Sequence, residues 1–103
     1  MLPKKHRLML RHFPDFFLKS KKTHSSLFTL FTLHAEVEFS QGAVVVPKKC
    51  LAKSSARNYA KRQVSELLYP ILKQKKNLQI VVLVKRSLEK TDLEKLKTAV
   101  ELA

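Results

Sequence analysis

Apolar residues along the chain change their spacing several times, and each change marks a predicted element. Residues 8–19 are predicted to form a helix, because apolar side chains recur there at steps of three and four and share one face. These residues are Leu10, Phe13, Phe17 and Leu18. Pro14 is tolerated only near a helix start or at a kink, so the helix is expected to begin near His12. Positive charges near the C-terminal end of a helix interact favourably with the helix dipole. Three lysines are expected at that end: Lys19, Lys21 and Lys22.

Four segments have the pattern of β-strands: residues 27–33, 35–39, 43–46 and 80–84. The second alternates cleanly and places Ala35, Val37 and Phe39 on one side. The fourth is continuously apolar, as expected of a strand covered on both faces. The only glycine, Gly42, is expected at a bulge or at a close approach of two backbones.

A second helix is predicted to begin at Ser54 or Ser55, either of which is a suitable N-cap. Its apolar stripe consists of Ala56, Ala60, Val64, Leu67 and Leu68. The opposite side carries Asn58, Lys61, Arg62 and Ser65, with Arg57 at the border. Pro70 disfavours helical geometry at Tyr69, so the helix is expected to end or kink there.

A third helix is expected near the C-terminus, where Thr91 and Glu94 have the spacing of a capping box. Its inner face consists of Leu93, Leu96, Val100 and Ala103. The predicted order of elements is therefore α-β-β-β-α-β-α, in one domain that spans residues 1–103. Helices packed against a small sheet make this an α+β fold, a two-layer α/β sandwich.

Charge narrows the choice of partner. The chain has 103 residues, 45% of them hydrophobic, a formal net charge of +13 and a sequence pI of about 10.2. Repulsion between so many positive charges disfavours the compact domain, and binding to a polyanion reduces this repulsion. The polyanion could be RNA, DNA or an anionic membrane. No stretch approaches the ~20 apolar residues of a membrane-spanning helix. The first thirty residues, with a single acid at Asp15, loosely resemble an organellar transit peptide, but they also fit the predicted fold.

The residues offer little catalytic or metal-binding chemistry of their own. Cys50 is the only cysteine, so an intrachain disulfide is excluded, which fits a reducing compartment. Together with the four histidines, this one cysteine does not form the ligand pattern of a zinc site. Carboxylates are scattered, and one glycine is too few for a phosphate-binding loop. We therefore expect no catalytic residue and no metal ligand in the chain, and we expect the cytoplasm as its location.

Cationic side chains concentrate in residues 48–62, which carry no acid. The stretch starts where the valine run ends and continues into the second predicted helix. Its candidate RNA-binding residues are Lys48, Lys49, Lys53, Arg57, Asn58, Lys61 and Arg62. Such a strand-to-helix unit can meet several phosphates at once, while a solvated basic helix face is the simpler alternative. Tyr59 is equally suited to stack on a base or to pack on the surface.

Six segments along the chain form a recognisable series. They are Leu2-Pro3-Lys4-Lys5-His6-Arg7-Leu8, Phe13 with Phe17, Phe28-Thr29-Leu30-Phe31-Thr32-Leu33, Val46-Pro47-Lys48-Lys49, Arg57-Asn58-Tyr59-Ala60-Lys61-Arg62 with Glu66, and residues 80–85. In this order, the six segments resemble those of the protein subunit of bacterial ribonuclease P. The family usually has arginine at the position of Tyr59 and commonly at that of Ser65, so the chain resembles a divergent member.

The resemblance implies a ribosomal protein S5 domain 2-like fold and assistance to a catalytic RNA that removes the 5′ leader of precursor tRNA. Mg²⁺ would be bound chiefly by the RNA. The partners would be ribonuclease P RNA and precursor tRNA, with no membrane and no obligate protein partner. A cleft between the first helix and the sheet would hold the leader, and the matching aromatic residues are Phe13, Phe17, Phe28 and Phe31. Taken alone, Phe28 and Phe31 fit a hydrophobic core as well.

Two other functions remain open from the residues alone. A ribosomal or RNA-assembly protein would share the basic surface but would lack the leader cleft. A self-sufficient nuclease would need carboxylates gathered at one site, whereas Asp15, Glu36, Glu38 and Glu66 are spread along the chain.

Overall fold

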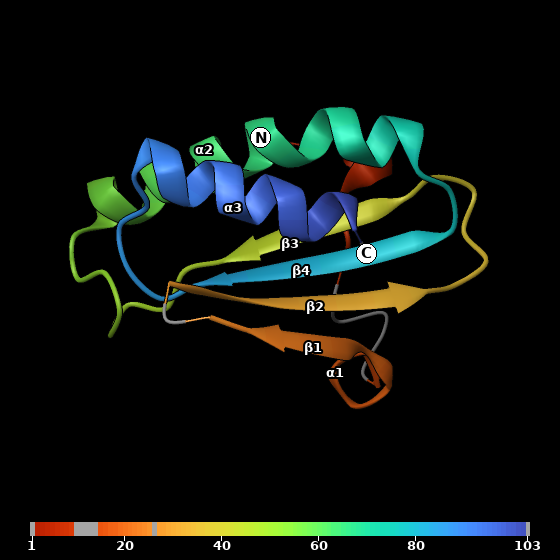
Figure 1. Ribbon diagram of the computed structural model, residues 1–103, viewed down its shortest axis with the longest axis horizontal. Helices are drawn as coiled ribbons and strands as arrows, with labels where there is room; N and C mark the ends of the chain where they lie inside the picture. The colour runs from red at the N-terminus through yellow and green to blue at the C-terminus, as the bar shows by residue number, and fades with distance from the viewer. Residues whose placement is uncertain (1, 10–14, 26, 103) are drawn as a thin grey trace.

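A computed structural model describes residues 2–9, 15–25 and 27–102 of the chain (Figure 1). Its elements follow the order η1 (Lys4–His6), α1 (Phe16–Lys19), β1 (Lys21–His24), β2 (Phe28–His34), β3 (Gln41–Val45), α2 (Ser54–Gln74), β4 (Leu78–Val84) and α3 (Lys90–Glu101). Apart from the short 3-10 turn η1, this is the predicted order α-β-β-β-α-β-α, and the α+β class is confirmed.

The four strands form one mixed sheet in the order β1-β2-β4-β3. β2 pairs antiparallel with β1 and with β4, and β3 pairs parallel with β4. The parallel pair is joined by α2, which contacts β3, β4 and α3. β4 is therefore central and buried nearly throughout, as its continuous apolar sequence predicts.

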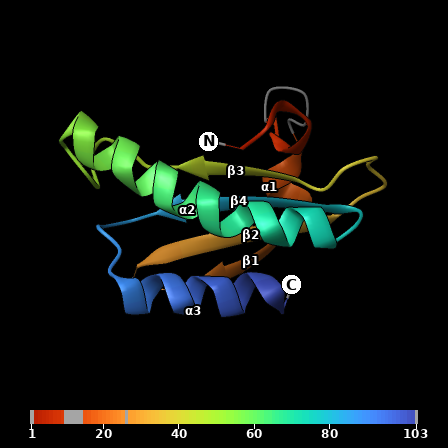
Figure 2. The same cartoon turned by 90° about the horizontal axis from the view of Figure 1, so that it is seen from above.

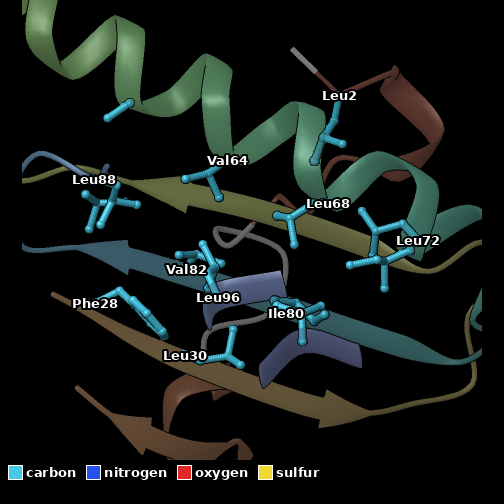
Figure 3. Packing of buried hydrophobic residues seen from close by; sticks show 14 of the residues in the cluster. Leu2, Phe28, Leu30, Val64, Leu68, Leu72, Ile80, Val82, Leu88 and Leu96 are labelled. Atoms are coloured by element: carbon cyan, nitrogen blue, oxygen red, sulfur yellow. The ribbon is translucent and has the colours of Figure 1, made fainter. Parts of the chain in front are cut away.

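α2 and α3 lie together on one face of the sheet, as the two views in Figures 1 and 2 show. Side chains at even positions of β2 and β4, such as Phe28, Leu30, Ile80 and Val82, point toward this helical layer. Figure 3 shows these side chains packed against Val64, Leu68 and Leu96. This is the main hydrophobic core. In the described part of the chain, the other face of the sheet carries no long helix.

The predicted strand at residues 35–39 is wrong, because these residues form a loop. The loop is held by Ser40, whose hydroxyl donates to the carbonyl of Lys75 (2.7 Å) and accepts from the amide of Leu78 (3.3 Å). Phe39 packs edge-on to the buried His6, with ring centroids 5.9 Å apart. Alternation alone does not make a strand when the segment has no strand partner.

β1, at residues Lys21–His24, was not predicted, because all four of its side chains are polar and exposed. These residues form the edge of the sheet, where pairing with β2 needs only backbone groups and a charged strand resists unwanted pairing. The lysines at positions 21 and 22 thus belong to a strand and not to a helix end.

Of the helix predicted over residues 8–19, the described residues show only the single turn α1. Leu8 and Met9 are not helical, α1 begins at Phe16, and Leu10, Pro14 and the predicted start near His12 lie outside the described residues. Its buried side chain is Phe16, at 1% exposure, whereas Phe17 and Leu18 face outward at 48% and 85%. The prediction that Phe17 and Leu18 face inward is therefore wrong. The side chain by which the single turn α1 packs on the sheet is that of Phe16, one residue earlier.

The other two helices differ from prediction at their ends. α2 begins at Ser54 and runs through Pro70 to Gln74, and α3 begins at Lys90. The capping box of α3 uses Glu89 and Asp92 instead of Thr91 and Glu94, and the amide of Glu89 donates to the Asp92 carboxylate (2.9 Å). Leu96 and Val100 are fully buried as predicted, while Ala103 lies outside the described residues.

Gly42 is a point of close approach, as its sequence context suggested. A Cβ atom at this position would lie 3.1 Å from Cδ1 of Leu72 and 3.6 Å from Cδ1 of Leu68. Its carbonyl also accepts a hydrogen bond from the amide of Leu8 (2.9 Å), which ties the N-terminal segment to the edge of β3. Glycine therefore lets α2 and the N-terminus close on the sheet.

Pro70 lies inside α2 and cannot donate to the carbonyl of Glu66. We expect Pro70→Ala to raise the free energy of unfolding by about 1 to 3 kcal/mol, because alanine restores the donor and favours the helix. Urea denaturation measures the change. Equal or lower stability of the variant would contradict the helix described for residues 66–74.

Candidate nucleic-acid interface

The sheet face turned away from α2 and α3 is here called the open face. It carries a second, smaller hydrophobic cluster, in which Leu8, Phe16 and Val81 are buried. Phe31, Leu33, Ala43 and Val45 pack against this cluster but remain partly exposed. In the described residues α1, the N-terminal segment and the loop after β2 lie against parts of this face, and apolar and aromatic surface beside them stays within reach of a ligand.

Phe17 and Phe31 meet on the open face. Their ring centroids are 4.9 Å apart at an interplanar angle of 83°, and Phe17 also contacts Phe16 edge-on at 5.5 Å. The ammonium of Lys22 lies 5.7 Å from the centroid of Phe31. Exposed aromatic rings next to cations are the elements from which single-strand binding sites are built.

Of the other two predicted leader-binding aromatic residues, the structure describes one, Phe28, and it does not join this pair. Phe28 is 5% exposed and belongs to the core under α2 and α3, on the opposite face from Phe31. Its assignment to leader binding is therefore withdrawn, because a buried ring between sheet and helices cannot meet RNA. Phe13 lies outside the described residues.

A cavity of about 270 Å³ lies where α1 and the loop after β2 meet the sheet. Its lining comprises Asp15, Phe16, Lys19, Leu33, Ala35, Glu36, Val37 and Gln79. The fully buried Gln79 donates from Nε2 to Oε1 of Gln41 (3.1 Å), and its own Oε1 has no partner among the described residues. Reversing both amides would leave Nε2 without such a partner instead, so one buried polar atom of Gln79 lacks a described partner in either orientation.

The predicted basic surface divides into exposed and half-buried parts. Five of the seven residues are exposed: Lys48, Lys49, Lys53, Asn58 and Arg62. Arg57 is half-buried, and its Nη1 donates to the carbonyls of Leu51 (3.0 Å) and Ala52 (2.8 Å). Arg57 thus organises the loop that carries the preceding lysines, a structural role that sequence reasoning missed.

Lys61 and Ser65 were predicted to lie on the outer side of α2, and this prediction is wrong. Ser65 is buried, and both line a groove of about 210 Å³ between α2, β3 and the N-terminal segment. Arg7 lines the same groove, and its Nε donates to the carbonyl of Leu2 (2.8 Å). The basic surface therefore extends from α2 across this groove to the N-terminus, and Arg7 is an addition that the sequence pattern did not single out.

Neither a metal site nor a membrane span is found in the part of the chain that the structure describes. Its residues contain no group of three or more His, Cys, Asp or Glu side chains that could hold a metal ion. Among the described helices, none is both long and apolar enough to cross a bilayer. Cys50 is a free, half-buried cysteine.

Comparison with known proteins identifies the family to which the chain belongs. A family model described as Ribonuclease P matches residues 2–103, and the chain belongs to that family. It is a protein subunit of the ribonucleoprotein endoribonuclease ribonuclease P, with an RNA as its partner and tRNA processing as its role. This assignment decides against the ribosomal or assembly protein considered above. No relative among curated proteins matches the chain.

Solved structures agree with the family assignment. The ribonuclease P protein of Thermotoga maritima is 26% identical, with a TM-score of 0.75 and coverage of 94% of this chain and 96% of that one. The same protein in complex with 1-(4-fluorophenyl)-2-thiourea gives 26% identity and a TM-score of 0.66, over 89% of this chain and 83% of that one. The Staphylococcus aureus protein shares the fold at 19% identity and a TM-score of 0.69, over 98% and 88% of the two chains.

The two hydrogen bonds of Arg57 lead to a stability prediction. Arg57→Ala should lower the free energy of unfolding by about 1 to 2 kcal/mol, because two backbone carbonyls lose a charged donor at a half-buried site. Lys61→Ala removes no side-chain hydrogen bond found within the described residues, so its stability should stay within about 0.5 kcal/mol of the parent. Thermal unfolding of both variants measures the contrast. Equal stability of the two would remove Arg57 from the structural role described above.

Proposed function

We propose that the open face of the sheet binds the single-stranded 5′ leader of precursor tRNA, while the basic surface of α2 binds the RNA subunit. The observation that carries the first part is the Phe17–Phe31 pair beside Lys22, on the face of the sheet opposite α2 and α3. Stacking on exposed rings beside cations suits a single strand, because every base offers a flat face and every nucleotide a phosphate.

The second part rests on the charge distribution. Lys48, Lys49 and Lys53 lie in and after the turn that follows β3, and Asn58 and Arg62 are exposed on the first turns of α2. Lys61 and Arg7 continue this surface across the groove beside β3. A folded RNA that meets this surface contacts several phosphates at once and releases their counterions. Asn58 can donate to or accept from a ribose hydroxyl or a base edge.

Under this proposal the chemistry of cleavage belongs to the RNA. Mg²⁺ held chiefly by the RNA would activate the attacking water, and the protein would position the leader and offset phosphate repulsion. The protein would act in the cytoplasm, together with precursor tRNA and its RNA subunit.

Cleavage of precursor tRNA by a bacterial ribonuclease P RNA tests the function, with and without the protein at low magnesium concentration. We expect the protein to stimulate cleavage and the product to end at the mature 5′ terminus. A folded protein that binds the cognate RNA without stimulating cleavage would refute the proposal.

The basic surface can be tested by the salt dependence of RNA-subunit binding. The double variant Lys61→Ala/Arg62→Ala should bind RNA with a weaker dependence on salt. If each residue contacts one phosphate, the slope of the logarithm of the association constant against the logarithm of the salt concentration should become less negative by about 1.4 to 1.8. The control is Lys95→Ala combined with Lys97→Ala, which removes the same charge from exposed positions of α3. An equal change in both double variants would indicate general electrostatic attraction instead of a defined contact surface.

The leader site can be tested at Phe17. Phe17→Ala should weaken the binding of leader-bearing precursor tRNA by about 1 to 3 kcal/mol, the contribution of one stacked base, and leave leaderless tRNA unaffected. Leu18→Ala is the matched control, because Leu18 is an exposed apolar neighbour in α1 that is outside the aromatic pair. Equal losses with and without the leader would argue for damage to the fold.

A further inference from the structure

Three cationic or ionisable side chains come together at one end of the open face. Lys22 pairs with Phe31 in the β1–β2 register, and His24 pairs with Thr29. Thr29 is in turn opposite Leu83 of β4, and Lys85 follows Leu83 by two residues. Because alternate residues of a strand share a face, Lys22, His24 and Lys85 lie on the same side of the sheet as Phe31.

Contacts at each residue show how the group is held. The ammonium of Lys22 lies over the Phe31 ring, and Nδ1 of His24 is 3.3 Å from Oγ1 of Thr29. Nζ of Lys85 donates to the carbonyl of Ser25 (2.9 Å), which fixes the lysine beside the β1–β2 turn. Each ammonium has three donors, so Lys85 keeps donors for a ligand after this bond.

No carboxylate of the described residues offsets the positive charge at this place. Repulsion by Lys22, then a small loss of solvation and then repulsion by Lys85 lower the pKa of the exposed His24 below its ordinary value of 6.5. No carboxylate contributes to this shift, and Thr29, which faces His24 from β2, is neutral. Neighbouring positive charges without a partner are unfavourable to the free protein and become favourable when an anion binds between them.

Protection of the sheet edge explains only part of this arrangement. Charged residues on β1 discourage pairing with another strand wherever they point. The edge needs neither a histidine bonded to Thr29 nor a lysine from beyond β4 that is anchored beside the same turn. The convergence of β1 and the end of β4 therefore points to a ligand.

We propose that Lys22, His24 and Lys85 form a phosphate-binding site for the single strand whose base lies against Phe17 and Phe31. The inference rests on the proposed function, since it takes the leader to be the strand on the open face. Lys22 joins the two parts of the site, because its ammonium lies beside Phe31 and its charge acts on His24. The leader would thus run from the aromatic pair toward the β1–β2 turn.

The site makes leader binding dependent on pH. In the free protein the lysines favour neutral imidazole, whereas a bound phosphate favours imidazolium and raises the pKa of His24. Binding therefore takes up a proton, and affinity increases as the pH falls through the histidine range. The two lysines contribute further electrostatic attraction to the phosphate.

The experiment uses the full chain and a short single-stranded RNA with the leader sequence. Affinity is measured from about pH 5 to about pH 8 at fixed ionic strength, and NMR follows the His24 ring and the rings of Phe17 and Phe31. We expect RNA to raise the pKa of His24, and binding to weaken with rising pH by up to about tenfold for each unit of that increase. His24→Gln should abolish this pH dependence, whereas His34→Gln, at the other end of β2, should retain it.

The outcomes separate this inference from the proposed function. If RNA shifts the Phe17 and Phe31 rings but leaves the pKa of His24 unchanged, the phosphate site is wrong and the leader proposal stands. If RNA changes neither the His24 pKa nor the signals of the Phe17 and Phe31 rings, both the phosphate site and the leader proposal are wrong. A response of His24 without the rings also overturns the inference, because the phosphate would not belong to a strand on the aromatic pair. A parallel titration with inorganic phosphate tests whether the site needs RNA; an equal increase in the His24 pKa at millimolar phosphate would indicate an unspecific anion site.

Discussion

The burial of β4 on both faces is the constraint on which the rest of the structure depends. Its even positions, including Ile80 and Val82, are covered by α2 and α3, while Val81 faces the other way. Because the two long helices lie on one side, the opposite side must be covered by smaller pieces. Phe16 and Leu8 cover Val81, and the remaining aromatic surface of Phe31 is left at the surface.

This asymmetry gives the two sides of the molecule different ways to meet RNA. The helical layer presents charge, through Arg62 and the lysines of the loop before α2, and suits a folded RNA read by its phosphates. The open face presents aromatic rings beside cations and suits a single strand. One small domain can therefore contact a structured RNA and an unstructured leader at the same time.

The sequence predicted the elements that need a hydrophobic pattern and missed those that do not. The core helices and β4 carry periodic or continuous apolar residues, so their existence and inner faces could be predicted. β1 has no apolar residue and is fixed by backbone pairing with β2, which composition cannot reveal. Residues 35–39 show the opposite case, since they alternate like a strand but are held as a loop by Ser40.

Parts of the candidate site were predictable and parts depended on three-dimensional contacts. Phe28 and Phe31 are three residues apart in one strand and must face opposite sides, so the sequence already argued against placing both in one cleft. The anchoring of Arg57 to the preceding loop, and the approach of Lys85 to β1, follow from the path of the chain between elements. No spacing rule along the sequence reports such contacts.

The central claim is that the open face, and not the helical layer, receives the leader. The most direct measurement is photo-crosslinking in the assembled ribonucleoprotein, with a photoreactive base in the leader and peptide mapping by mass spectrometry. The account predicts crosslinks in α1 and β2, at or beside Phe17 and Phe31. Crosslinks confined to the outer surfaces of α2 or α3, for example at the exposed Tyr59, would contradict it.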